Sequence, residues 1–136
     1  MTKILIYTDG GARNNPGPAG AGIFALEGDR KLFELKKYLG EQTNNFAEYE
    51  ALILALTEAK KRGLAEREIE VRMDSELIVR QMTNEYQVKE ETLWPQYMKV
   101  HNLIVAHFPD AKFVHVRREE NKEADRLVNE AIDEAS

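Results

Sequence analysis

The chain has 136 residues, of which 43% are hydrophobic and 32% are charged, a balance typical of a globular protein rather than a disordered one. It contains no cysteine, which excludes disulfides, thiolate nucleophiles and zinc–thiolate sites. No apolar run approaches the roughly 20 residues that a membrane span requires. The formal net charge of −5 does not favour the basic surface that neutralises phosphate. We expect a single cytoplasmic domain over residues 1–136, without a signal peptide.

The first part of the chain predicts three antiparallel strands in a meander. They are expected at residues 1–8, 21–26 and 31–39. A four-residue turn at 27–30 joins the second and third strands as a hairpin. Residues 10–22 hold five of the eight glycines and two of the four prolines. We therefore expect residues 14–18 to form a turn outside the strands.

The rest of the chain alternates helices with strands. Apolar periodicity and cap residues predict four helices, at residues 43–63, 74–84, 90–107 and 121–135. Two further strands are expected at residues 68–73 and 112–116. We expect Leu77 and Trp94 to face the interior as parts of apolar helix stripes. This order indicates an α/β fold, with one five-stranded mixed sheet and helices on both of its faces.

Four carboxylates stand out because of their positions in these elements. Asp9 and Asp74 are expected at the ends of the first and fourth strands, where sites usually assemble in sheets of this kind. Glu48 lies on the apolar stripe of its helix, and Asp125 is expected on the inward side of the last helix. Carboxylates on burying faces are unfavourable unless something compensates them, and no basic partner is evident at matching positions. Bound divalent cations would compensate converging carboxylates, since hard ions prefer oxygen ligands.

Each of these carboxylates also has a purely structural explanation. Taken separately, the four explanations are a turn opened by Asp9, a capping box of Asn45 with Glu48, a helix N-cap at Asp74, and a partly exposed helix position for Asp125. Sequence spacing alone does not show that the four side chains meet.

Four segments, taken in order, resemble motifs of type 1 ribonuclease H. They are residues 7–17 (YTDGGARNNPG), 43–48 (TNNFAE), 73–75 (MDS) and 121–125 (NKEAD). The similarity runs from residue 4 to about residue 131 and includes the order of the elements. The resemblance therefore covers nearly the whole chain and implies a ribonuclease H-like fold.

The resemblance further implies an endonuclease that cuts the RNA strand of RNA–DNA hybrids and leaves 5′-phosphate and 3′-hydroxyl ends. By position, the catalytic residues and metal ligands would be Asp9, Glu48, Asp74 and Asp125. They would hold two Mg²⁺ ions, which Mn²⁺ can replace. One ion would activate the attacking water and the other would stabilise the departing 3′ oxygen. The protein would act as a monomer, with no membrane contact.

Further residues match family positions near the substrate or precede the last helix. The expected substrate contacts are Gly10, Gly11, Asn15, Asn44, Asn45, Ser75, Arg117 and Arg118. Amide side chains can donate to and accept from the 2′-hydroxyl that distinguishes RNA from DNA. The structural alternative is that the asparagines serve as turn and cap residues, and both roles can coexist.

Two departures from the family pattern bear on substrate binding and turnover. The basic insertion that many members carry after the helix beginning at Asp74 is absent, which makes this a compact, archaeal-type form. The loop before Asp125 also lacks the histidine that many members use in turnover. Arg118 or Glu120 is a candidate substitute, because the nearest histidine, His115, belongs to a strand. We therefore expect weak substrate affinity.

Two other functions compete with hybrid-specific cleavage. One is a non-catalytic module that binds hybrids, which the presence of all four carboxylates argues against. The other is a different nuclease on the same fold, of the resolvase or transposase type, which fold alone does not exclude. The Asp9-Gly10-Gly11 segment and the segment at residues 43–45 favour the ribonuclease.

Overall fold

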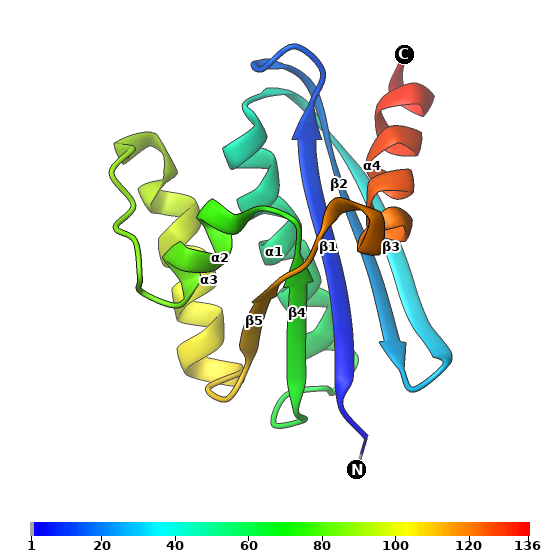
Figure 1. The fold of residues 1–136 in the computed structure, drawn as a ribbon, viewed down its shortest axis with the longest axis vertical. Coiled ribbons are helices and arrows are strands. Elements are labelled where there is room, and N and C mark those ends of the chain that lie inside the picture. Colours follow the sequence, from blue (N-terminus) through cyan, green and yellow to red (C-terminus); the bar gives the residue numbers. More distant parts are fainter. Residues whose placement is uncertain (1) are drawn as a thin grey trace.

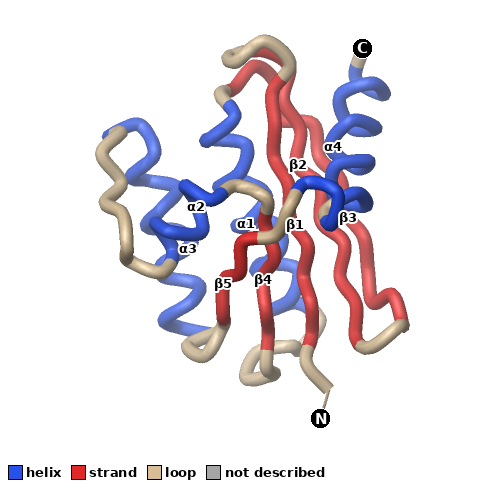
Figure 2. The backbone as a smooth tube through the Cα atoms, in the orientation of Figure 1, coloured by secondary structure: helices blue, strands red, loops and turns tan. Residues whose placement is uncertain are grey.

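The computed structural model describes residues 2–136, and its centre is a five-stranded sheet in the order β3-β2-β1-β4-β5 (Figure 1). The strands are β1 (Ile4–Ala12), β2 (Gly17–Glu27), β3 (Arg30–Gln42), β4 (Ile69–Met73) and β5 (Lys112–His115). The first three pair antiparallel, while β4 is parallel to β1 and β5 is parallel to β4. The predicted mixed sheet is therefore confirmed. Its two hairpin turns lie at opposite ends of the sheet (Figure 2).

Four α-helices flank the sheet, and they do not share one face. They are α1 (Asn44–Lys61), α2 (Glu76–Met82), α3 (Trp94–His107) and α4 (Lys122–Ala135), with short 3₁₀ turns at Glu91–Leu93 and Arg118–Glu120. Helix α1 packs on β1 and is covered in turn by α3, whereas α4 lies on the opposite face over β2 and β3. None of the helices formed by residues 2–136 is long and apolar enough to cross a membrane.

The main core lies between the sheet and α1. Ile4 and Ile6 of β1 are fully buried against Leu52 and Leu56 of α1 in one apolar cluster. Because side chains alternate along a strand, the next residue on this face of β1 is Thr8, and Asp9 points to the α4 face. Burial of this face thus fixes the direction of the Asp9 side chain.

Glycines allow both helices to approach the sheet closely. A Cβ atom on Gly10 would overlap the backbone of Ala47 in α1. On the other face, a Cβ on Gly22 would overlap the Ala124 carbonyl oxygen and lie 2.8 Å from Leu127 Cβ. There is no room for a methyl group at either position. The absence of a side chain at these glycines therefore lets α1 and α4 lie this close to the sheet.

Several details of the sequence prediction are wrong at the turns. Gly17 and Pro18 belong to β2, so the first turn is confined to residues 13–16. Pro18 has no backbone N–H to donate to a neighbouring strand, and proline in a sheet is therefore confined to positions such as the first residues of a strand. Its carbonyl oxygen accepts from Arg13 N at 2.9 Å. The second hairpin turn is also shorter than expected, with only residues 28 and 29 between β2 and β3.

Two apolar residues expected in the interior are exposed instead. Leu77 is 39% exposed and Trp94 is 50% exposed. The predicted helix at 90–107 divides into a 3₁₀ turn and α3, with the boundary at Trp94. The exposed Trp94 is the first residue of α3, and its Nε1 donates to the Val88 carbonyl oxygen at 2.7 Å.

Replacing Gly22 with alanine is expected to destabilise the protein by about 3 kcal/mol, because the new methyl group forces α4 away from β2. Gly11→Ala is the matched control, since its Cβ would meet nothing closer than Asn44 Oδ1 at 3.9 Å. We expect the control to change stability by less than about 1 kcal/mol. Urea denaturation followed by circular dichroism measures both values, and equal losses in the two variants would contradict this account.

Candidate active site

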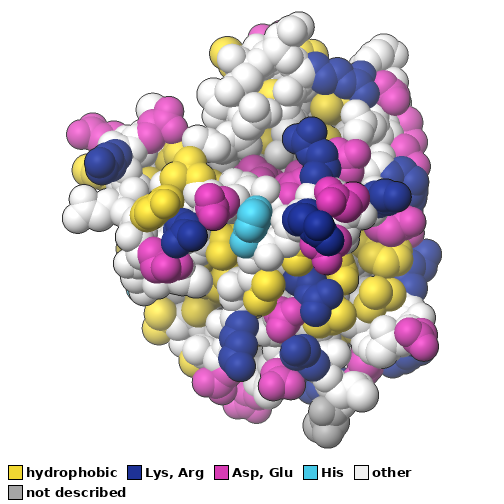
Figure 3. Space-filling model, viewed as in Figure 1, with side chains coloured by type: hydrophobic (Ala, Val, Ile, Leu, Met, Phe, Trp, Pro, Cys, Tyr) yellow, Lys and Arg dark blue, Asp and Glu magenta, His cyan; other side chains and the backbone are white. Residues whose placement is uncertain are grey.

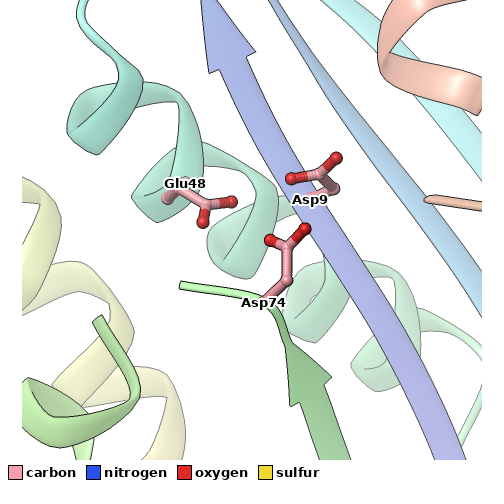
Figure 4. Close-up of side chains that lie close together, drawn as sticks. All are labelled: Asp9, Glu48 and Asp74. Carbon is pink, nitrogen blue, oxygen red and sulfur yellow. The ribbon is translucent and has the colours of Figure 1, made fainter. Parts of the chain in front are cut away.

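Three carboxylates from three separate elements meet beside the carboxyl end of β4. Asp9 comes from β1, Glu48 from α1 and Asp74 from the residue after β4, and their side chains point toward one another (Figure 4). One carboxylate oxygen from each lies within 4.8 Å of the others. Asp9 and Glu48 are buried, at 8% and 5% exposure. The expected convergence of these three is therefore seen in the structure.

Unequal strand lengths bring the two aspartates together. The parallel pairing of β1 with β4 ends at Thr8 and Met73, although β1 continues to Ala12. Asp9 is thus in the middle of its strand rather than at its end, which corrects the prediction. Asp74 follows Met73 directly, so both aspartates lie just past the last paired residues.

Glu48 is held in place by the backbone of β1. Gly10 N donates to Glu48 Oε1 at 2.5 Å, across the contact with α1 that the missing glycine side chain permits. The capping-box explanation of Glu48 is wrong, because the N-cap of α1 is Thr43, whose Oγ1 accepts from Phe46 N at 3.2 Å. The stripe position of Glu48, facing the sheet, was predicted correctly.

Asp74 is likewise not a helix cap. The N-cap of α2 is Ser75, whose Oγ accepts from Ile78 N at 3.3 Å. Asp74 is therefore free to face the cluster. A basic partner, which the sequence did not reveal, is Arg118, whose Nε lies 4.0 Å from Asp74 Oδ2. The Arg118 side chain is 88% exposed, so it screens the cluster only weakly.

Burial and mutual repulsion disfavour the charged forms of these groups. Burial, together with the charges of Asp74 and Asp125, raises the pKa of Asp9 from 3.8 to about 8. Burial and the Asp9 carboxylate raise the pKa of Glu48 well above its ordinary value. The pKa of Asp74 is also raised by burial, against the opposing charge of Arg118. Without a cation, the cluster resists full ionisation.

Asp125 joins this site from the exposed side. The prediction of an inward position is wrong, because Asp125 is exposed while its neighbours Ala124 and Val128 are buried. It nevertheless lines the same cavity as the three clustered carboxylates, and a hydrogen bond that its side chain accepts from protonated Asp9 contributes to the raised pKa of Asp9. The four carboxylates thus share one cavity, three of them in close contact.

The cavity has a volume of about 480 Å³ and is open to solvent along the start of α1 and α4. Of the expected substrate contacts, it is lined by Gly10, Gly11, Asn44, Asn45, Ser75 and Arg118. Asn15 and Arg117 do not line it. Asn15 Oδ1 accepts from Asn44 N at 2.9 Å and so ties the hairpin turn to α1. Arg117 pairs with Glu119 and Glu120 on its own segment.

Sequence reasoning missed two polar residues of the cavity wall, Arg13 and Asn129. The Arg13 guanidinium donates to Asn129 Oδ1 at 3.2 Å and pairs with Asp133 at 2.8 Å, which links the hairpin turn to α4. The position of Arg13, four residues after Asp9 in a glycine-rich segment, is a signal that could have found it. Asn129 gives no comparable signal in the sequence.

The donor set fits divalent cations. Carboxylate oxygens from three elements are already grouped, and hard ions such as Mg²⁺ and Mn²⁺ bind oxygen ligands. The two arginines that line the cavity, Arg13 and Arg118, have side chains that are 43% and 88% exposed, so bound cations would neutralise the buried charges more effectively than these arginines do. Basic and acidic side chains alternate over the surrounding face, without a continuous basic surface (Figure 3).

Known proteins have the same fold and are similar to this chain in sequence. Residues 7–131 match the family model described as "Reverse transcriptase-like". A bifunctional protein of Mycobacterium tuberculosis is 41% identical over 98% of this chain and 36% of its own length. Its N-terminal ribonuclease H domain, solved as a fusion with maltose binding protein, has a TM-score of 0.91 over 99% of this chain and 96% of that chain.

Two further proteins are similar over nearly all of this chain. Ribonuclease HI of Halobacterium salinarum is 38% identical over 98% of this chain and 66% of its own length. A solved structure of this enzyme has a TM-score of 0.90 and covers 97% of this chain and 98% of that one. A ribonuclease H1 isolated from compost, solved in complex with an RNA/DNA hybrid, is 53% identical with a TM-score of 0.94, over 97% of this chain and 98% of that one.

The chain spans about a third of the length of the mycobacterial relative and about two thirds of that of the halobacterial one.

The raised pKa of Asp9 predicts how stability depends on pH in the metal-free protein. A carboxyl whose pKa rises on folding, here from 3.8 to about 8, stabilises the fold fully below pH 3.8 and loses this contribution as the pH rises to 8. The unfolding temperature in EDTA should therefore increase as the pH is lowered from 8.5 to 6. Asp9→Asn should flatten this dependence and raise the midpoint at pH 8.5 by roughly 4 °C.

Thermal denaturation at a series of pH values in EDTA provides the measurement. Asp29→Asn, in the exposed hairpin turn, is the matched control and should follow the wild-type curve. A lower midpoint for Asp9→Asn at pH 8.5, with the pH dependence unchanged, would show that Asp9 supports the fold rather than straining it.

Proposed function

Since this chain belongs to the type 1 ribonuclease H family, we propose that it hydrolyses the RNA strand of RNA–DNA hybrids and leaves 5′-phosphate and 3′-hydroxyl ends. Its similarity to a haloarchaeal enzyme agrees with the compact, archaeal-type form expected from the missing basic insertion. The observation that carries the proposal is the group of clustered carboxylates whose repulsion bound cations would relieve.

We propose that Asp9, Glu48, Asp74 and Asp125 hold two Mg²⁺ ions, for which Mn²⁺ can substitute. When bound, such ions supply a Lewis acid at the scissile phosphate and lower the pKa of the attacking water. The role of the chain is to fix the carboxylates beforehand. Asp9 and Glu48 are buried and share the Gly10 backbone as a support, while Asp125 approaches from the solvent side.

Discrimination of RNA from DNA is assigned to the start of α1. Asn44 Oδ1 accepts from Ala12 N at 2.8 Å, so this asparagine already holds the end of β1 through its oxygen. Its Nδ2 group makes no hydrogen bond within residues 2–136 and is available to a 2′-hydroxyl at the cavity. The nearest neighbour of a Cβ on Gly11 would be Asn44 Oδ1 at 3.9 Å, so the RNA backbone can approach Gly11 closely.

We also propose that the protein acts as a monomer in the cytoplasm. The grouped carboxylates and the lining of their cavity all come from one chain, so a second copy is not needed to build the site.

Cleavage of matched duplexes tests the proposal directly. RNA–DNA, RNA–RNA and DNA–DNA duplexes of one sequence are incubated with Mg²⁺ or with excess EDTA. We expect cutting only of the RNA strand of the hybrid, and only with Mg²⁺. Equal cutting of the DNA–DNA duplex, or full activity in EDTA, would refute the proposal.

Asp9→Asn and Asp74→Asn are each expected to lower kcat on the hybrid by at least about 100-fold, because each removes a charge that holds the cations. Asp29→Asn, which changes an exposed carboxylate outside the cavity, should keep wild-type kcat. Circular dichroism checks that all three variants are folded. Wild-type kcat in either site variant would show that the cluster is structural.

Arg118 and Arg117 form a matched pair for testing phosphate contacts. With few basic residues at the site, the wild type should make no more than roughly three phosphate contacts, each adding a slope of about −0.9 to log K against log salt. Arg118→Ala should raise KM and flatten this slope by about one contact, because Arg118 lines the cavity. Arg117→Ala should change both less, since this side chain already pairs with Glu119 and Glu120.

Steady-state kinetics on the hybrid at several salt concentrations separates the outcomes. Unchanged KM and slope in Arg118→Ala would show that this arginine is ordinary surface. A large loss of kcat at constant KM would instead give Arg118 a direct role in turnover, in place of the missing loop histidine.

A further inference from the structure

Asn121 occupies the N-cap position of α4, but its side chain does not cap the helix. Instead, Asn121 Nδ2 donates to the carbonyl oxygen of Thr8 in β1, at 2.9 Å. The residue is only 1% exposed. An asparagine at a helix start normally accepts from the first backbone amides of the helix. This one is turned toward the sheet.

The hydrogen bond from Asn121 reaches β1 at the residue directly before Asp9. Thr8 is the last β1 residue that pairs with β4, and the next residue is Asp9. The backbone of Asn121 is bonded in both directions along its own segment. Its carbonyl oxygen accepts from Asp125 N at 3.1 Å, and its amide donates to the Arg118 carbonyl oxygen at 3.0 Å. Asn121 thus connects the strand that carries Asp9 to the first turn of the helix that carries Asp125.

The segment before α4 crosses over the sheet between β5 and α4 (Figure 1). Arg118 of this segment lies near Asp74, and Asp125 in the first turn of α4 raises the pKa of Asp9, yet both the Arg118 and the Asp125 side chains are exposed. Neighbouring side chains do not pack tightly around an exposed side chain, so its position depends on the backbone that carries it. Asn121 is the buried polar residue between them, so its bond to Thr8 fixes the backbone from which both side chains extend.

We infer that Asn121 is a positioning residue, which holds Asp125 beside Asp9 and Arg118 beside Asp74 by anchoring the start of α4 to the Thr8 carbonyl. This inference rests on the proposed function of the carboxylate site.

The cost of this arrangement to stability supports a role in the site. Asn121 Oδ1 is buried without a hydrogen-bond partner within residues 2–136, and a buried polar atom without a partner is unfavourable. The start of α4 also forgoes a side-chain cap. Unfavourable local choices of this kind are expected at functional sites, where geometry takes precedence over stability.

The experiment compares metal affinity and turnover in Asn121→Ala. Removal of a residue that orients a metal ligand typically lowers affinity or activity by about 10–100-fold. We expect the affinity for Mn²⁺, measured by calorimetry on the protein alone, to fall about 10-fold. The value of kcat on the hybrid should fall by a similar factor, with KM changed less than about threefold. Asn121→Ser, whose side chain is too short to reach Thr8, should change both values in the same direction and serves if the alanine variant does not fold.

Two controls separate positioning from general loosening. Lys122→Ala changes the exposed neighbour of Asn121 and should keep wild-type affinity. Val100→Ala opens a space in the buried face of α3, on the other side of the sheet, and should lower the unfolding temperature without changing Mn²⁺ affinity. Loss of affinity in Val100→Ala equal to that in Asn121→Ala would overturn the inference. So would affinity and kcat within twofold of wild type in the Asn121 variants.

The calorimetric readout is independent of cleavage. A wild-type protein that binds Mn²⁺ but leaves the hybrid intact would contradict the proposed function, while the affinities of the Asn121 variants would still decide whether this residue positions the site.

Discussion

The repulsion among three clustered carboxylates, two of them buried, is the constraint on which the rest of this structure depends. Asp9, Glu48 and Asp74 come from different elements, and one oxygen of each lies within 4.8 Å of the others. Burial raises the pKa of all three, so the metal-free fold holds them in an unfavourable arrangement. Such an arrangement persists only where the surrounding framework is rigid. It makes the site ready for cations, because the ligands need little reorganisation.

The framework obtains this rigidity from close contacts on both faces of the sheet. Gly10 allows the backbone of α1 to reach β1, which brings Glu48 to the Gly10 amide. Gly22 allows α4 to approach β2 just as closely from the other side. The carboxylates are therefore carried by elements whose spacing is fixed by backbone contacts. Side chains with more freedom would not maintain the same distances.

The electrostatics of the site also bear on how an acidic protein would carry out the proposed reaction on a polyanion. The net charge is −5, yet the negative charges nearest the cavity are those that bound cations would neutralise. Arg13 and Arg118 provide positive charge at the rim, and Arg13 is partly neutralised by Asp133. Attraction of the proposed substrate would thus depend on bound ions more than on a basic surface, since acidic and basic side chains are mixed on the face shown in Figure 3.

The sequence by itself determined the order of the elements, the mixed sheet and the inward direction of Glu48, because these follow from hydrophobic periodicity and local turn chemistry. Only the tertiary structure decided that Asp9 lies in mid-strand, since this depends on the antiparallel pairing of β1 with β2 as far as Ala12. It also decided that Asp125 is exposed and that Asn121 bonds to Thr8 rather than capping α4. The bond from Asn121 to Thr8 joins residues that are 113 positions apart in the chain, a contact that no local pattern encodes.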